Sequence, residues 1–245
     1  IIGWNLRANQ LLLEMDHYIP KDSQIQILIT NSLVVNSDSM KNLKLINADV
    51  KILRGITTDR NLLNSLDLSN FDHIVLLSFS DRLSQQTADS KTLITLLHLR
   101  DIASKVNGCH YSILTEMLDV RNLELAEVTK VDDFIVSDRL VSLLITQISE
   151  RKALGGVFED IFNPEGSEIY LKSAHNYVEL NQEVNFCTIV ESARRRNEVA
   201  IGFRTGKDAT NKKANYGIVL NPHKLEMKSF SDDDEIIVLS ESFNG

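Results

Sequence analysis

The residues with the clearest potential for chemistry surround the first glycine of the chain, in the run GWNLRA from Gly3 to Ala8. A helix that begins on a glycine turn directs backbone N–H groups at whatever lies above it, which favours an anion. A dinucleotide site requires G-x-G-x-x-G, and only the first glycine is present. Ala8 can replace the third glycine, whereas Asn5 brings a side chain into the diphosphate path. Arg7 offers a positive charge to an anion, so the turn predicts either a smaller ligand or the start of a packed helix.

Carboxylates form a second candidate group. Asp59, Asp81, Glu116 and Asp119 fall at or just beyond predicted strand ends, where their oxygens could hold a hard divalent cation. Asp59 and Asp81 have a simpler interpretation as helix caps, for which Asp is a preferred residue. Glu116 is the better ligand candidate because it directly follows an apolar strand. The run Asp232 to Glu235 is interpreted as a solvated turn.

Signatures of catalysis are missing from the sequence. It contains no G-x-S-x-G, no H-E-x-x-H and no P-loop with Lys followed by Ser or Thr. Cys109 and Cys187 lie far apart without Cys-x-x-Cys spacing, which favours neither a disulfide framework nor a zinc site. We therefore expect no enzyme activity and a reducing compartment.

Composition sets the class of protein. The chain has 245 residues, of which 43% are hydrophobic and 24% charged, as in ordinary globular proteins with one large or two modest domains. A net charge of −8 argues against a nucleic-acid partner, which needs a Lys/Arg surface. No apolar run approaches the roughly 18 to 20 residues of a membrane span, and no signal peptide is visible. Because the sequence begins without Met, in mid-strand, we expect a soluble part of a longer protein.

Strand and helix patterns alternate through the first 151 residues. Apolar strand patterns cover residues 1–2, 24–31, 50–55, 73–78, 110–116 and 132–137. Helical patterns cover residues 5–16, 38–46, 59–66, 81–105, 121–128 and 138–151. Such alternation predicts an α/β fold, a Rossmann-like doubly wound parallel sheet over 1–151. After Lys152 short strands become frequent and Gly155-Gly156 should break the helix, so residues 152–245 are expected to form a smaller α+β domain with a helix from Cys187 to Arg195.

Ligands of doubly wound sheets bind at the carboxyl ends of the strands. The ligand-binding residues expected there are Gly3, Trp4, Asn5, Arg7, Thr30, Asn31, Gly55, Thr57, Ser78 and Asp81. The second strand should end on an acid for a ribose, but it ends on Thr30-Asn31, which weakens the NAD interpretation further. We expect the side chains of Trp4, Asn5 and Arg7 to fill the space that a dinucleotide occupies in folds of this type, or to bind a smaller ligand.

Several segments resemble the RCK/KTN family of regulatory domains, most closely those of the CASTOR/POLLUX ion channels and their bacterial relatives. They are GWNLRANQLLLEMD, RGITTDRNLL, VDDFIVSDRLVSLLITQISE, TIVESARRRNEVAIGFR and DDDEIIVLSES, which together span nearly the whole chain. The resemblance implies a module on the cytoplasmic side of a membrane that follows the pore domain of the same polypeptide. It also implies dimers that assemble into a gating ring, in which ligand binding pulls on the pore.

The resemblance also bears on the cation. In calcium-gated RCK domains, acids after the fourth and fifth strands hold the ion, and Glu116 matches the fifth-strand acid. The fourth-strand position is the apolar Leu77, and Leu118 follows Glu116 by two residues. A calcium site would therefore need other carboxylates, and the expected metal set is Glu116, Asp81 and Asp119.

Three functions follow from these patterns, of which the last belongs to a different class and is the least favoured. The first is a non-enzymatic, ligand-gated regulatory domain of an ion channel that senses a cation such as calcium, or a small ligand. The second is a nucleotide-binding regulatory subunit of a potassium transporter, and the last is an NAD-dependent enzyme. The helix 138–151, together with the segment 93–103, is expected to form a two-fold dimer interface, because its apolar surface exceeds what one sheet flank covers.

Overall fold

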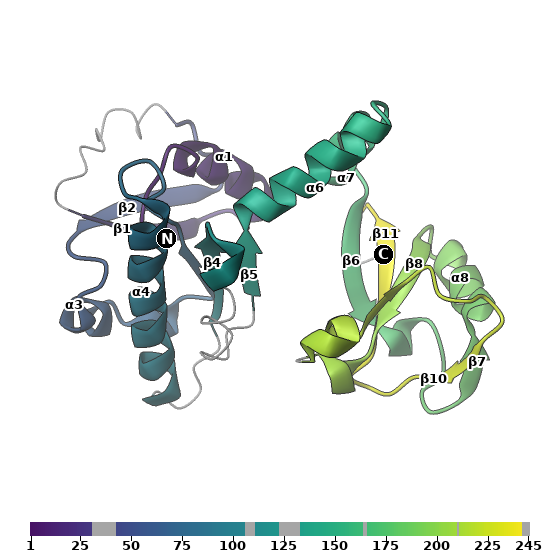
Figure 1. Ribbon diagram of the computed structural model, residues 1–245. Helices are drawn as coiled ribbons and strands as arrows, with labels where there is room; N and C mark the ends of the chain where they lie inside the picture. The colour runs from purple at the N-terminus through teal and green to yellow at the C-terminus, as the bar shows by residue number, and fades with distance from the viewer. Residues whose placement is uncertain (31–42, 106–110, 123–132, 164–165, 210, 242–245) are drawn as a thin grey trace. The chain divides into compact units, whose positions relative to one another are not determined.

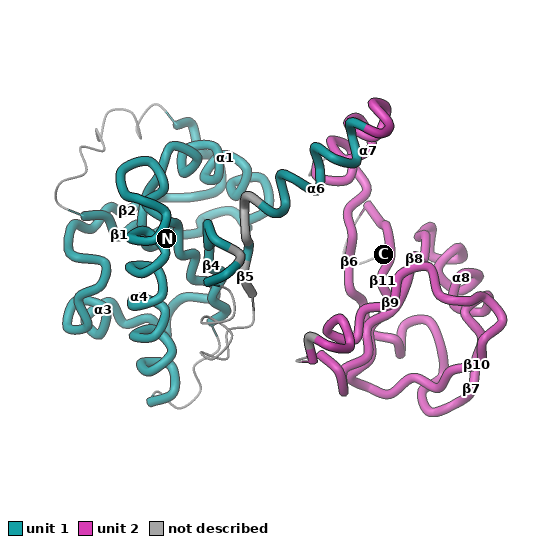
Figure 2. Tube along the Cα trace, in the orientation of Figure 1, with its two compact units in different colours: residues 1–149 teal, residues 150–245 magenta. Residues whose placement is uncertain are grey.

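The computed structural model describes residues 1–245 apart from 31–42, 106–110, 123–132, 164–165, 210 and 242–245. The chain divides into two compact units, Ile1–Ser149 and Glu150–Gly245 (Figure 2). The sequence pattern changes at nearly the same place, between Arg151 and Lys152. Each unit has buried apolar clusters of its own.

A parallel sheet forms the centre of unit 1 (Figure 1). Its strands are β1 (Ser23–Ile29), β2 (Ala48–Arg54), β3 (His73–Leu76), β4 (Ser112–Met117) and β5 (Asp133–Val136). The start of the chain lies between β1 and β3, where Ile2 forms parallel bridges to Leu28 and Leu76. The order across the sheet is therefore β2, β1, Ile2, β3, β4, β5. This is the expected doubly wound arrangement, and its strand order reverses at the first residues of the chain.

Helices cover both faces of this sheet. They are α1 (Ala8–Tyr18), α3 (Arg60–Ser65) and α4 (Gln85–Lys105), with short 3-10 turns η1 (Leu68–Asn70) and η2 (Val120–Asn122). Leu12 of α1 packs with the isoleucines of β1, whereas Leu96 and Leu99 of α4 pack with Leu28 in a separate cluster. Alternate residues of β1 thus enter different cores, as expected for a strand buried on both faces. The helix α6 (Ser137–Glu150) follows β5 and ends at the boundary of the unit.

Gly3 is required by the backbone at the point where the chain leaves the sheet. Its φ is +97°, and a Cβ built there would lie 2.2 Å from the carbonyl oxygen of Leu77. The neighbouring hydrogen bonds fix this approach, since the N–H of Gly3 donates to Leu28 and that of Leu77 donates to Ile2, at 3.0 and 2.9 Å. Only glycine combines a positive φ with so close a backbone contact.

Some expected helices of unit 1 differ from the structure. The first begins at Ala8 rather than Asn5, and Leu6 is 85% exposed instead of packed. Residues 38–42 and 123–128 lie outside the described residues, and the described part of the 38–46 segment is not helical.

Unit 2 is built on an antiparallel sheet with a separate two-stranded ribbon. The sheet order is β6 (Glu168–Ser173), β11 (Glu235–Ser240), β8 (Val199–Arg204) and β9 (Ile218–Leu220), and the ribbon pairs β7 (Glu183–Asn185) with β10 (Met227–Ser229). The helices are α7 (Leu154–Ile161) and α8 (Phe186–Arg195), with 3-10 turns η3 (Ala174–Asn176), η4 (Gly206–Asp208) and η5 (Lys212–Gly217). The α+β class and the helix from Cys187 to Arg195, observed as α8, are confirmed. The expected break at Gly155-Gly156 is wrong, because both glycines lie inside α7.

The core of unit 2 holds one buried ion pair beside its aromatic residues. Lys172 Nζ lies 2.7 Å from Oε1 of Glu198, and both side chains are at most 5% exposed. Tyr177 donates its hydroxyl to the other oxygen of Glu198 at 2.5 Å. Burial would raise the pKa of Glu198, but the bonds from Lys172 and Tyr177 lower it below its usual range. In the acid run, Asp234 is buried rather than solvated, and it accepts N–H groups from Gly206 and Ser231.

Replacing Gly3 should test the backbone constraint at the start of the sheet. We expect Gly3→Ala to lower the stability of unit 1 by about 2 kcal/mol or more, because a positive φ and a backbone clash act together. Trp4 is the only tryptophan of the chain, so its fluorescence reports urea unfolding of this unit. The exposed substitution Asn9→Ala is the matched control and should stay within about 0.5 kcal/mol. Equal midpoints for the two variants would contradict the constraint.

Candidate functional site

Asn5 occupies the position at which a dinucleotide-binding turn has its second glycine, and its side chain is buried. Its Nδ2 donates to the carbonyl oxygen of Ser78 and to Oε2 of Glu116, each at 3.0 Å. Its Oδ1 accepts from the backbone N–H of Arg7 at 3.0 Å. Asn5 therefore ties the glycine turn to the ends of β3 and β4 with its own amide, in the place where a diphosphate approaches the backbone in dinucleotide sites.

Glu116 is the other fixed point of this arrangement. Its side chain in β4 is 11% exposed, and Oε2 also accepts from the backbone N–H of Ser78 at 3.0 Å. Oε1 forms an ion pair with the guanidinium of Arg7, whose side chain is 54% exposed. The pair thus combines an inner carboxylate with an outer cation that solvent reaches. We call Asn5, Arg7 and Glu116 the switch-point latch.

The N–H groups at the start of α1 already have acceptors. The N–H of Leu6 donates to Oδ2 of Asp81, that of Arg7 to the Asn5 side chain, and that of Ala8 to the Asn5 carbonyl oxygen. These contacts explain why the helix begins three residues later than its pattern indicates. One acceptor is a carboxylate, so the protein itself supplies the anion expected at the glycine turn.

The two capping interpretations have different outcomes. Asp59 caps α3, since its side chain accepts from the N–H of Asn61 at 2.9 Å. Asp81 does not sit at the start of α4, which begins at Gln85, and bonds Leu6 instead. The cap expectation is confirmed for Asp59 and is wrong for Asp81.

The described hydrogen bonds join Asn5, Arg7, Ser78, Glu116 and, through Leu6, Asp81 into one group. The other expected ligand residues lie nearby in the fold but are held by local contacts. Trp4 packs against the α1 cluster, Gly55 donates its N–H to Ile29, and the carbonyl oxygen of buried Thr57 accepts from Thr95. Thr30 follows β1, whereas Asn31 lies outside the described residues.

The expected metal ligands are each held by other groups. Asp119 is bound by the guanidinium of Arg121, and these hydrogen bonds lower the pKa of the Asp119 carboxyl. Glu116 is held by Arg7, and Asp81 by Leu6. Within the described residues, no three His, Cys, Asp or Glu side chains gather as a metal site. Coordination by Glu116, Asp81 and Asp119 stays a prediction that requires these contacts to open.

Asp89 is a residue that positions the candidate site and that the sequence patterns missed. It is fully buried in α4, and its carboxylate accepts from the N–H groups of Leu118 and Asp119 and from Nδ2 of Asn122. Asp89 thereby fixes the chain just after Glu116. In the sequence, a charged residue on the apolar face of the helix could have indicated that Asp89 is buried and hydrogen-bonded, but it does not identify the partner.

Two buried hydroxyls lie beside the latch. Ser78 Oγ and Thr115 Oγ1 have no hydrogen-bond partner among the described residues, and both residues are fully buried. Ser78 donates its N–H to Glu116, and Thr115 precedes Glu116 in β4. A buried hydroxyl without a partner costs free energy, so these two hydroxyls reduce the stability of the strand ends that carry the latch.

The latch offers two charges with which a ligand could compete. A cation that reaches Glu116 competes with Arg7, and an anion that reaches Arg7 competes with Glu116. Either event would break the ion pair that joins Arg7 to β4, whereas the hydrogen bonds of Asn5 to Ser78 and Glu116 do not depend on that pair. A ligand with different affinity for the closed and open arrangements shifts their populations.

Comparisons with known proteins agree with this fold and add a family. No family model matches the chain. The probable ion channel POLLUX of Oryza sativa subsp. japonica is 33% identical over 235 residues, covering 84% of this chain and 23% of that protein. The ion channel CASTOR of Lotus japonicus is 27% identical, covering 98% of this chain and 31% of its own length. The chain therefore spans about a quarter to a third of these relatives.

Solved structures show the fold independently of sequence. The human SLO3 gating ring superposes with a TM-score of 0.65 at 10% identity, over 98% of this chain and 44% of that one. In the described part of this chain, no helix is both long and apolar enough to cross a membrane. The chain is thus a relative of the CASTOR and POLLUX ion channels that has the fold of an RCK gating-ring domain.

Proposed function

We propose that this chain is a ligand-sensing regulatory domain of an ion channel, without catalytic activity, on the cytoplasmic side of a membrane. The relatives it matches are ion channels, and the remaining length of those relatives has room for a pore domain in the same polypeptide. Binding at the strand ends of unit 1 opens the switch-point latch, and the pore domain that precedes unit 1 responds to this change. The observation that carries this proposal is the Arg7–Glu116 pair, a separable contact at the topological switch point of the sheet.

A divalent cation such as calcium is the first candidate ligand. Glu116 is the matching acid, and it is mostly buried with its charge neutralised by the more exposed Arg7. A cation approaching from solvent meets Arg7 first and must displace it. Asp81 and Asp119 are the nearest further carboxylates in the sequence pattern, and both are already orientated by neighbouring donors.

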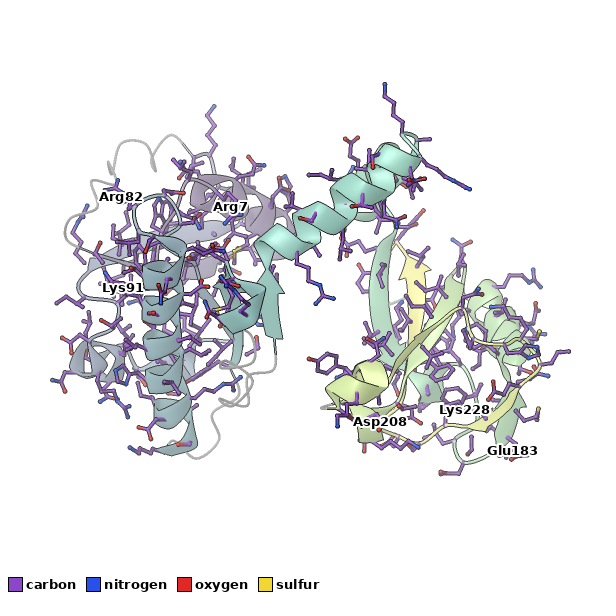
Figure 3. The ribbon with its side chains drawn as sticks, in the orientation of Figure 1. Arg7, Arg82, Lys91, Glu183, Asp208 and Lys228 are labelled. Atoms are coloured by element: carbon purple, nitrogen blue, oxygen red, sulfur yellow. The ribbon has the colours of Figure 1, made fainter. Side chains whose placement is uncertain are left out.

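A nucleotide is the second candidate, as in a regulatory subunit of a potassium transporter. Figure 3 labels three cations in the part of unit 1 that holds the glycine turn, Arg7, Arg82 and Lys91. Lys91 Nζ lies 5.8 Å from the ring centroid of Phe79 and has no carboxylate partner among the described residues. These charges favour a phosphate, whereas the carboxylates of Asp81 and Glu116 oppose it.

The chain is expected to act as a homodimer that assembles into a gating ring. α6 exposes apolar side chains to half or more of their area, with Leu140 at 52%, Val141 at 50%, Leu143 at 55% and Ile145 at 62%. Such a continuous apolar face on one helix is typical of a protein interface. An isologous pairing of α6 with its copy would cover it.

Opposite effects of two substitutions should separate the cation from the anion. If calcium binds, Glu116→Gln should weaken its affinity at least tenfold, while Arg7→Met should strengthen it about fivefold or more by removing the competing cation. If ATP or ADP binds, Arg7→Met should weaken the affinity for the nucleotide and Glu116→Gln should strengthen it. Affinities follow from thermal shifts, since ligand at 100 times its dissociation constant adds about 2.7 kcal/mol of stability.

The remote pair Arg60–Asp101 provides the matched control for this experiment. Arg60→Met and Asp101→Asn remove charges of the same type from unit 1 and should leave both affinities unchanged. No stabilisation by calcium, magnesium, ATP, ADP or NADH would contradict ligand sensing at the latch. Loss of affinity in both Arg7→Met and Glu116→Gln would contradict the competition.

Restoring the missing glycine should not create an NAD site. Asn5→Gly removes three hydrogen bonds of the Asn5 side chain and is expected to lower the stability of unit 1 by about 2 kcal/mol. NADH should still fail to quench Trp4 fluorescence at millimolar concentration, because Asp81 and Glu116 keep their negative charges in the diphosphate path. Quenching by NADH in Asn5→Gly would instead favour a dinucleotide site blocked by one side chain.

Light scattering should detect the dimer and its interface. The 245-residue chain is expected to have the mass of a dimer at tens of micromolar, and Val141→Glu combined with Ile145→Glu should make it monomeric. Gln147→Glu adds a charge to the same helix at an exposed polar position and serves as the control. A monomeric unsubstituted chain at high concentration would contradict the assignment of α6 to the interface.

A further inference from the structure

Unit 2 contains a cavity that is independent of the latch. Its volume is about 350 Å³, within the range of small-molecule sites, and it is lined by residues of β7, α8, β8, β9 and β10. The floor consists of Phe186, Ile189, Phe203 and Phe230, each less than 10% exposed. The rings of Phe203 and Phe230 meet edge to face at 5.5 Å. The cavity therefore has a rigid aromatic floor, suited to a flat apolar group.

A positive charge lies over this floor. Lys228, labelled in Figure 3, places Nζ 4.8 Å from the ring centroid of Phe203 and 5.6 Å from that of Phe230. Lys224 places Nζ 4.6 Å from the ring centroid of Phe186. Within the described residues Lys228 forms no ion pair, so the aromatic faces are its only described partners. A half-buried ammonium gains more from a carboxylate than from ring faces.

The rest of the lining limits the kind of ligand. Val219 and Met227 add partly exposed apolar walls, and His223 and Glu226 are the polar residues at the outer edge. Glu226 disfavours a ligand with several negative charges, such as a nucleotide phosphate. A ligand with one anionic group would place that group beside Lys228 and its apolar body against the floor of the cavity.

We propose that unit 2 binds a small monocarboxylic acid with a flat aromatic body. The carboxylate pairs with Lys228, and the apolar body fills the cavity above the buried phenylalanines, where it covers the exposed side chains of Val219 and Met227. Val219, on the edge strand β9, closes the side of the site. The residues of this site belong to unit 2 and those of the latch to unit 1, and the two sites favour different ligands. The chain would therefore respond to a second ligand.

Isothermal titration calorimetry with 2-naphthoate tests the site directly. The probe should bind the 245-residue chain with a dissociation constant below about 1 mM, and the neutral 2-naphthamide should bind at least tenfold more weakly. Lys228→Met keeps the apolar stem and should lower naphthoate affinity about tenfold, to the level of the amide, while leaving the amide unchanged. Lys213→Met, which removes an exposed charge elsewhere in unit 2, should change neither affinity.

Two further measurements locate the probe and guard against misfolding. Naphthoate should shift the methyl NMR signals of Ile189 and Val184 in the unsubstituted chain, and Val219→Trp should abolish binding of both compounds by filling the cavity. Absence of naphthoate binding, equal affinity for acid and amide, or unchanged affinity in a folded Lys228→Met variant would each overturn the proposal. Methyl shifts confined to unit 1 would also overturn it.

Discussion

The close passage of Gly3 past Leu77 is the constraint on which the arrangement of unit 1 depends. It brings the first residues of the chain between β1 and β3, and so places Asn5 over the carboxyl ends of β3 and β4. With a Cβ at this point the turn would be displaced, and the amide of Asn5 would no longer meet both Ser78 and Glu116. The backbone geometry at Gly3 thus positions the latch residues, and the charges of Arg7 and Glu116 then hold them together.

As a consequence, side chains of the protein itself accept hydrogen bonds from the N–H groups that bind a phosphate in nucleotide-binding folds of this type. A glycine turn and helix start normally leave N–H groups for a phosphate, but here Asp81 and Asn5 accept them. The negative charge of Glu116 is balanced by Arg7 rather than by a bound cation. Because that balance rests on a partly exposed guanidinium, its net contribution to stability is expected to be small, about 1 kcal/mol. In the proposed function, a contact of that strength would hold the state without ligand and still allow a ligand to replace it.

Much of this architecture followed from local patterns. The apolar strands, the glycine turn and the change of composition near residue 152 predicted the doubly wound sheet and the smaller α+β unit. What local patterns could not supply were partners distant in sequence. Asp81 looked like a helix cap because its true partner, Leu6, lies 75 positions earlier, and Asp89 is explained only by the chain after β4. Gly155 and Gly156 looked like a break, yet α7 continues, with the rings of Phe158 and Phe162 stacked one helical turn apart at 6.5 Å.

In the proposed function, Arg7 and Glu116 form the contact that ligand binding breaks. A double-mutant cycle with Arg7→Met and Glu116→Gln, followed by Trp4 fluorescence in urea, measures their coupling free energy. Without ligand the coupling should be about 1 kcal/mol in favour of the folded state, and at a saturating concentration of the bound ion or nucleotide it should fall to near zero. A coupling of zero without ligand, or one that saturating ligand leaves unchanged, would contradict the account.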